Sequence, residues 1–86
     1  MTNQDLLERI TIRPDVMVGK PIIRGTRIPV ALILRMLGQG IPPEEILREY
    51  PRLERADIDA AVAYAARVVA HEDIFPVPVE DEPLTA

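Results

Sequence analysis

Apolar residues recur at helical spacing in the middle of the chain. The i, i+3, i+4, i+7 pattern of a helix with one buried face is met by Val30, Ile33, Leu34 and Leu37. Pro29 suits the first helical position, where its missing N–H costs nothing, and Gly38 or Gly40 suits a left-handed end. The pattern therefore predicts a short helix that begins at Pro29.

Two further helices are predicted after it. Prolines followed by Glu44 and Glu45 mark the start of the second helix, and Pro51 ends it at about Tyr50. The third helix ends near His71, and one apolar face of it comprises Ile58, Ala61, Val62, Ala65 and Val69. Because only residues 51–53 separate these two helices, the pattern indicates a helix-turn-helix.

The segment before these helices is broken by proline and glycine. Between residues 10 and 30 they are too frequent for a long helix. The β-branched pieces that remain lie at 10–12, 16–18 and 22–23. They predict two or three short strands or a hairpin, and the strand that contains Pro21 should be an edge because proline cannot donate to a ladder.

The elements together predict a mainly α fold. A three-helix bundle with a helix-turn-helix follows short N-terminal β-strands, and an extended C-terminal tail ends the chain. We divide the chain into an N-terminal segment (1–9), a domain (10–71) and an acidic, proline-rich tail (72–86). The three prolines of the tail favour an extended course.

Composition narrows the possible chemistry. The 86 residues include no cysteine and no serine, which excludes disulfides, thiolate metal sites and a serine or cysteine nucleophile. The single histidine, His71, is expected to complement a helix dipole rather than to bind a metal. We therefore expect no catalytic residue, no metal and no cofactor, and so no enzyme.

Length and hydropathy bear on assembly and location. A chain this short buries only about 60–65% of the surface that its unfolded form exposes, so we expect a homodimer. There is no run of about 18 apolar residues and no signal-peptide pattern at the N-terminus. These features predict a cytoplasmic protein without a membrane partner.

The net charge of −4 is unevenly distributed. Residues 9–35 hold six basic residues against Asp15 alone, a net charge of +5, whereas residues 72–86 hold five acids and no base, a net charge of −5. Blocks of opposite sign attract different partners. The sequence therefore indicates a basic front and an acidic tail.

The basic residues are candidates for contacting DNA. The candidate set is Arg13, Lys20, Arg24, Arg27, Arg52 and Arg55. Phosphate contacts of this kind add affinity that depends on salt but not on sequence. The alternative is structural, because Arg24 or Arg27 could pair with Glu44, Glu45 or Glu49 and hold the loop to the second helix.

The third helix is a weak candidate for reading bases. Its exposed face offers Arg55, Asp59, Ala63, Ala66 and Arg67, whereas base edges are read mainly by Arg, Lys, Asn and Gln. Any DNA contact must therefore depend on Arg52, Arg55 and the basic front.

The tail offers a second kind of surface. Its apolar residues alternate with prolines, and the candidates for binding a partner protein are Ile74, Phe75, Val77 and Val79. The alternative is a terminal segment that only adds solubility.

Several motifs together resemble a known family. They are GKPIIRGTRIPV at 19–30, GI at 40–41, EEIL at 44–47, YPRL at 50–53, DIDAA at 57–61 and AYA at 63–65. The chain is similar over about residues 10–70 to the prokaryotic family called domain of unknown function 433. In the third helix Glu54 stands where the family usually has a Ser or Thr cap, so we expect that helix end to fray.

The resemblance implies a homeodomain-like helix-turn-helix and membership among the VapB-like antitoxins. Such antitoxins bind a PIN-like ribonuclease toxin, block its cleavage of RNA, and as dimers repress their own promoter. The leading hypothesis is thus an antitoxin of a toxin-antitoxin system that binds a PIN-like toxin and operator DNA. The alternative is a module that binds protein only and has no DNA contact.

Overall fold

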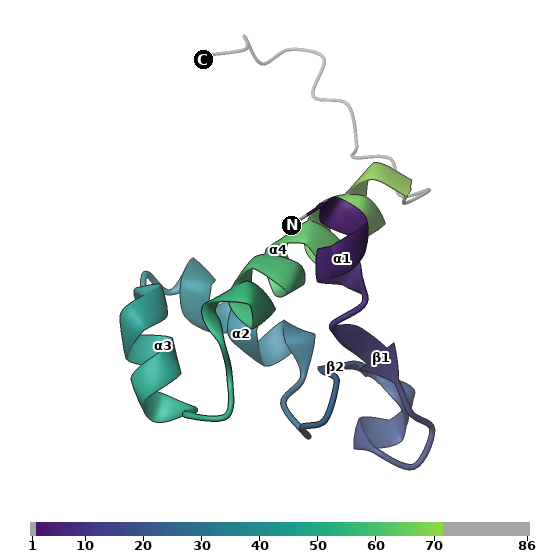
Figure 1. Cartoon of the computed structure of the whole chain (residues 1–86), viewed down its shortest axis with the longest axis horizontal. Coiled ribbons are helices and arrows are strands. Elements are labelled where there is room, and N and C mark those ends of the chain that lie inside the picture. The colour runs from purple at the N-terminus through teal and green to yellow at the C-terminus, as the bar shows by residue number, and fades with distance from the viewer. Residues whose placement is uncertain (1, 72–86) are drawn as a thin grey trace, which may run out of the picture.

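The computed structural model describes residues 2–71 and is mainly helical (Figure 1). The elements in chain order are α1 (Asn3–Leu7), β1 (Ile10–Ile12), the 3-10 turn η1 (Met17–Gly19), β2 (Pro21–Ile23), α2 (Val30–Gly38), α3 (Pro43–Glu49) and α4 (Arg55–His71). The strands form an N-terminal hairpin, and α2, α3 and α4 form the helical part. This arrangement confirms the predicted fold class; the proposed tail lies outside the described residues.

The hairpin is a two-stranded antiparallel sheet. Thr11 lies opposite Ile22 and Ile12 lies opposite Pro21, so the proline stands at the end of the ladder, where it costs least. An isolated bridge between Ile22 and Pro29 covers part of the outer side of β2. The outer side of β1 has no such bridge among residues 2–71.

Residues 16–18 do not form the third short strand that their β-branched character suggested. They belong to the connection between β1 and β2, which contains η1. Val18 has φ 55° and Gly19 has φ 75°, and these left-handed conformations turn the chain away from an extended course. The requirement to reverse direction overrides the local β-propensity here.

The three main helices lie where the hydrophobic pattern placed them. Pro29 is the N-cap of α2 rather than its first helical residue, and Gly40 has the left-handed φ of 85° after the helix. Pro43 opens α3, which ends before Tyr50. The segment between α3 and α4 is closed by a hydrogen bond from the N–H of Leu53 to the carbonyl of Tyr50, at 2.9 Å.

The core joins β2 to all three of these helices. Its buried members are Ile23, Val30, Ile33, Ile46, Leu53, Ile58 and Ala61. Burying an aliphatic side chain of this size contributes about 1.5–3 kcal/mol, so this small set supplies much of the stability. Ile46 of α3 and Leu53 of the segment between α3 and α4 both belong to this core.

The apolar face predicted on α4 is buried only in its first half. Ile58 and Ala61 are buried, but Val62 is 49% and Val69 is 75% exposed. The helix continues beyond α2 and α3, and α1 lies against its later turns (Figure 1). The last turns of α4 therefore keep an apolar side that residues 2–71 leave uncovered.

The N-terminal segment contains a helix that the sequence reasoning missed. The hydroxyl of Thr2 accepts from the N–H of Asp5 at 3.2 Å, and the carboxylate of Asp5 accepts from the N–H of Thr2 at 3.1 Å. The hydrogen bond from the Thr2 backbone N–H, and after it the interaction with the Thr2 side chain, hold the pKa of the Asp5 carboxyl below its ordinary value of 3.8. Since α1 packs on α4, residues 2–9 belong to the folded unit.

The start of α4 is closed without a Ser or Thr cap, which corrects the expectation of fraying at Glu54. The carboxylate of Asp57 accepts from the N–H of Glu54 at 2.8 Å and from the guanidinium of Arg9 at 3.1 Å. Asp57 is buried, and Arg9 also lies 3.7 Å from the carboxylate of Glu54. The acid three residues after the cap position thus accepts from the N–H of the cap residue, which is one of the two hydrogen bonds of a capping box.

Within residues 2–71, none of the helices has the length and apolar character needed to cross a membrane.

Candidate nucleic-acid interface

The loop after β2 is the structural base of the candidate site. Gly25 has φ 80°, which a side chain disfavours, and it allows the chain to turn immediately after the strand. The hydroxyl of Thr26 donates to the carbonyl of Ile23 at 2.7 Å and accepts from the N–H of Ile28 at 3.0 Å. Because both hydrogen bonds cross the loop, its backbone has a defined shape, and the hydroxyl is occupied on both sides.

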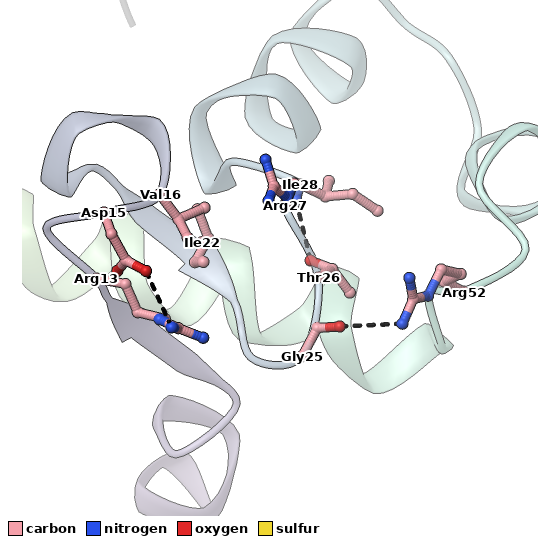
Figure 2. A pocket seen from close by; sticks show the side chains of 9 residues that line it. All are labelled: Arg13, Asp15, Val16, Ile22, Gly25, Thr26, Arg27, Ile28 and Arg52. Carbon is pink, nitrogen blue, oxygen red and sulfur yellow. Dashed lines mark hydrogen bonds and ion pairs between the residues drawn. The ribbon is translucent and has the colours of Figure 1, made fainter.

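Arg52 joins this loop to the connection between α3 and α4. Its guanidinium donates to the carbonyl of Gly25 at 3.2 Å, across 27 positions of sequence (Figure 2). A guanidinium carries five N–H donors, so this bond leaves most of them for another partner. The positive charge of Arg52 is thereby placed beside the loop.

A cavity of about 500 Å³ opens along the loop. Figure 2 shows Arg13 and Asp15 on one side of it and Arg52 on the other. The lining residues are Arg13, Asp15, Val16, Ile22, Gly25, Thr26, Arg27, Ile28 and Arg52. We call this cavity the basic pocket. Its lining has three guanidinium groups and one carboxylate, so it favours the binding of an anion.

The charges of the basic pocket are only partly neutralised within the chain. The guanidinium of Arg13 lies 3.1 Å from the carboxylate of Asp15, and both side chains are exposed, so water weakens this pair. Arg27 is exposed and takes part in none of the ion pairs formed within residues 2–71. Arg27 is therefore available to a ligand as far as this part of the chain is concerned.

A second cavity, of about 370 Å³, adjoins the basic pocket and has a different character. Thr26 and Arg52 line both, and the second also receives Arg24. Four acids line it as well: Asp5, Glu8, Glu54 and Asp57. Arg24 therefore lies among carboxylates, which makes it a weaker candidate for a phosphate than Arg27.

The six predicted cationic residues are thus only partly brought together. Arg13, Arg27 and Arg52 share the basic pocket, Arg24 lies in the neighbouring cavity, and exposed Lys20 lines neither. Arg55 lies 3.9 Å from Glu44 and 3.7 Å from Asp59. Its charge is shared with these two carboxylates, which weakens it as a reader of bases.

The structural alternative for the basic loop is wrong in its details. Neither Arg24 nor Arg27 pairs with an acid of α3 within the described residues. Arg52 holds the loop to the helix-turn-helix instead, through a backbone carbonyl. Glu44 of α3 pairs with Arg55.

Arg9 is the cation that sequence reasoning missed. Its partner Asp57 is 48 positions away, and the side chain of Asp57 is only 8% exposed. The one signal in the sequence was an acid in the first turn of a helix whose cap position lacks Ser or Thr. The tail candidates Ile74, Phe75, Val77 and Val79 lie outside the described residues.

Comparisons with known proteins agree on one family. A family model described as "Protein of unknown function (DUF433)" matches residues 10–65. A crystal structure of a DUF433 member protein from Anabaena variabilis is similar, with a TM-score of 0.69 and 39% identity, over 78% of this chain and 66% of that one. That likeness includes the fold as well as the sequence.

Two curated relatives also match. The uncharacterized protein y4eO of Sinorhizobium fredii is 36% identical over 58 residues, which are 67% of this chain but 26% of that protein. An uncharacterized protein of Archaeoglobus fulgidus is 53% identical over 30 residues, 35% of this chain and 83% of its own length. The chain thus spans about a quarter of the length of the Sinorhizobium protein.

Proposed function

The chain belongs to the DUF433 family, and from this premise we propose that it is a non-enzymatic, antitoxin-like protein that contacts DNA phosphates through the basic pocket. Its protein partner would be a PIN-like ribonuclease toxin, which it would inhibit by covering the nuclease site. As a homodimer it would bind its own promoter.

The observation that supports DNA contact is the grouping of Arg13, Arg27 and Arg52 beside the helix-turn-helix. These residues come from three separate parts of the chain, and the folded loop places them along one cavity. Guanidinium groups match the geometry of phosphate oxygens and hold their charge at every physiological pH. The pocket would therefore grip the DNA backbone.

The exposed face of α4 suggests that this binding has little base specificity. Arg55 is engaged with Glu44 and Asp59, and the later positions of that face are largely alanine. Each protomer would then supply few phosphate contacts. A second copy in a dimer would double them, which gives the dimer a role in repression.

A titration of promoter DNA across salt tests the DNA contact. The full chain and the DNA upstream of its own gene are used in a gel shift at several salt concentrations. Because each phosphate contact releases counterions, we expect affinity to fall steeply as salt rises. In a plot of log affinity against log salt concentration, Arg27→Ala should reduce the slope by about one unit.

Arg35→Ala is the matched control, since Arg35 is an exposed arginine on α2 outside the basic pocket. Its slope should equal that of the unmodified chain. Absence of binding even at low salt would sink the repressor role.

Co-purification tests the toxin partner. The chain is co-expressed with the product of the neighbouring reading frame, and the purified complex is assayed for ribonuclease activity. We expect an inactive complex. If a chain ending at residue 71 binds that product undiminished, the tail residues Ile74, Phe75, Val77 and Val79 are not the contact.

A protein-only interaction module is the second candidate, and the exposed face of α4 favours it. That face offers few side chains that read base edges, since Arg55 is followed on it by Asp59, Ala63 and Ala66. Toxin binding together with no DNA binding at low salt would support this alternative.

A further inference from the structure

Among residues 2–71, the backbone groups on the outer edge of β1 form no ladder with another strand. In an antiparallel pair, alternate residues direct their N–H and C=O away from the partner strand. The N–H of Arg24 donates to the carbonyl of Arg9 at 2.8 Å, so positions 9 and 11 face β2 and positions 10 and 12 face outward. Ile10 and Ile12 therefore offer the donors and acceptors that an added strand requires.

An apolar cavity of about 430 Å³ lies along this edge. It is lined by Leu7, Ile10, Thr11, Ile12, Tyr64 and Arg67. Its lining comes from α1, β1 and α4, and no residue of β2 lines it. Ile12 is 57% exposed, a large apolar surface for a strand residue to leave uncovered.

The two faces of β1 differ in charge. By the alternation of a strand, the side chains of Ile10 and Ile12 share one face of β1, and those at positions 9, 11 and 13 share the other. Residues directly opposite each other in neighbouring strands lie on the same face and interact. A complementary strand would thus place apolar residues beside Ile10 and Ile12 and an acidic residue beside Arg13, because Arg9 is already paired with Asp57.

This charge pattern argues against the pairing of two copies of the chain about Thr11. If β1 paired with itself about Thr11, Arg9 of each copy would lie opposite Arg13 of the other. Like charges directly opposite each other destabilise a ladder. An acidic partner strand would instead be attracted by Arg13 and by Arg67, which lines the cavity.

We propose that the open edge of β1 and the adjoining apolar cavity bind an extended segment of a partner protein in which acidic and apolar residues alternate. The segment adds a third strand to the sheet, its apolar side chains cover Ile12 and enter the cavity, and Arg67 at the rim attracts its acids. The apolar cavity and Arg67 share no residue with the basic pocket, so this surface can be tested at Arg67 without touching the proposed DNA contact.

A short synthetic peptide of alternating valine and glutamate is the probe, and its counterpart of alternating valine and lysine is the control. The full chain is titrated with each, and amide hydrogen exchange is followed by NMR. We expect the valine-glutamate peptide to slow exchange at Ile10 and Ile12 and to bind on the order of tenfold more tightly than the control.

Two variants test the geometry. Ile12→Pro removes an outward N–H that the hairpin does not use, and Arg67→Glu reverses the charge at the rim; each should weaken binding by about three- to tenfold. Arg35→Glu makes the same charge change on α2 and should leave affinity within about twofold. Circular dichroism checks that the variants fold. If Ile12→Pro does not fold, the protection of Ile10 and Ile12 from exchange in the unmodified chain still tests the proposal.

Equal affinity for both peptides, or binding without protection of Ile10 and Ile12, overturns the proposal. A second copy of the chain on the edge would also overturn the proposal. In that case the chain sediments as a dimer and binds neither peptide, and Ile12→Pro makes it monomeric.

Discussion

At the residue scale, Asp57 is the most consequential side chain of the described structure. Its carboxylate accepts from the backbone of Glu54 and from Arg9, so one buried acid closes the start of α4 and connects that helix to the segment before β1. Arg9 is 30% exposed, so this contact is only partly shielded from water. Such a group is costly to remove because it leaves an N–H and a guanidinium without their acceptor.

Asp57→Ala should therefore lower the free energy of unfolding by about 1–3 kcal/mol, measured by urea denaturation. Asp59→Ala is the matched control on the same helix. Its carboxylate is 55% exposed and lies 3.7 Å from Arg55, so its loss should change stability by less than about 0.5 kcal/mol. Equal losses of unfolding free energy in the two variants would show that the buried contact of Asp57 stabilises the fold no more than the exposed contact of Asp59.

Asp5 makes the stability of α1 depend on pH. Because the pKa of its carboxyl is lowered in the folded chain, the folded state favours the charged form. The contribution of the capping box is present above the ordinary value of 3.8 and is lost as pH falls through the lowered folded value.

Acidification from about pH 6 to about pH 2 should therefore speed amide exchange at Asp5 relative to its intrinsic rate, as followed by NMR. In Asp5→Ala this extra dependence should be absent. A variant with the same pH profile as the unmodified chain would contradict a role for the carboxylate.

At the scale of elements, the loop after β2 depends on one backbone conformation. Gly25 has φ 80° and no heavy atom near the position of an added Cβ, so a side chain there would meet strain rather than a clash. Gly38, at the end of α2, also has open space but no positive φ. A side chain would meet no clash at either glycine, so comparing substitutions at the two positions isolates the cost of the backbone conformation at Gly25.

Gly25→Ala should destabilise the fold by about 1–2 kcal/mol, because the left-handed region is unfavourable for a residue with a Cβ. Gly38→Ala should instead stabilise it by about 0.5–1 kcal/mol, because alanine is the better helix former. Thermal unfolding followed by circular dichroism measures both. The same sign of change for both substitutions would mean that φ at Gly25 does not constrain the loop.

At the scale of the whole molecule, stability depends on a core of few residues. A domain of this size has a total stability of roughly 4–13 kcal/mol. Ile46 of α3 is completely buried in the core, where α3 packs against α2 and α4. A single truncation in such a core removes a large part of the total.

Ile46→Ala should cost about 2–5 kcal/mol of unfolding free energy, measured by urea denaturation. Val69→Ala on α4 is the control for loss of an aliphatic side chain. Val69 is 75% exposed, so its truncation should change stability by less than about 0.5 kcal/mol. A similar loss from both variants would place the core elsewhere.

Much of this molecule can be predicted from local pattern. Val30 and Ile33 define the buried side of α2, Pro43 opens α3, and the β-branched pieces near Ile10 and Ile22 form the hairpin. Each depends on residues close in the chain, whose spacing decides the element. The helix α1 was missed because its five residues carry little periodicity.

The sequence by itself determined the three main helices, the hairpin, the family, and the number and positions of the arginines along the chain. Only the tertiary structure decided what those arginines do. Arg9 stabilises α4, Arg52 reaches the loop at Gly25, Arg55 is held by Glu44 and Asp59, and Arg27 stays available within the described residues. The physical reason is distance: an ion pair forms only when two groups come within about 4 Å. Positions 27 or 48 residues apart reach that distance only through the packing of the whole chain.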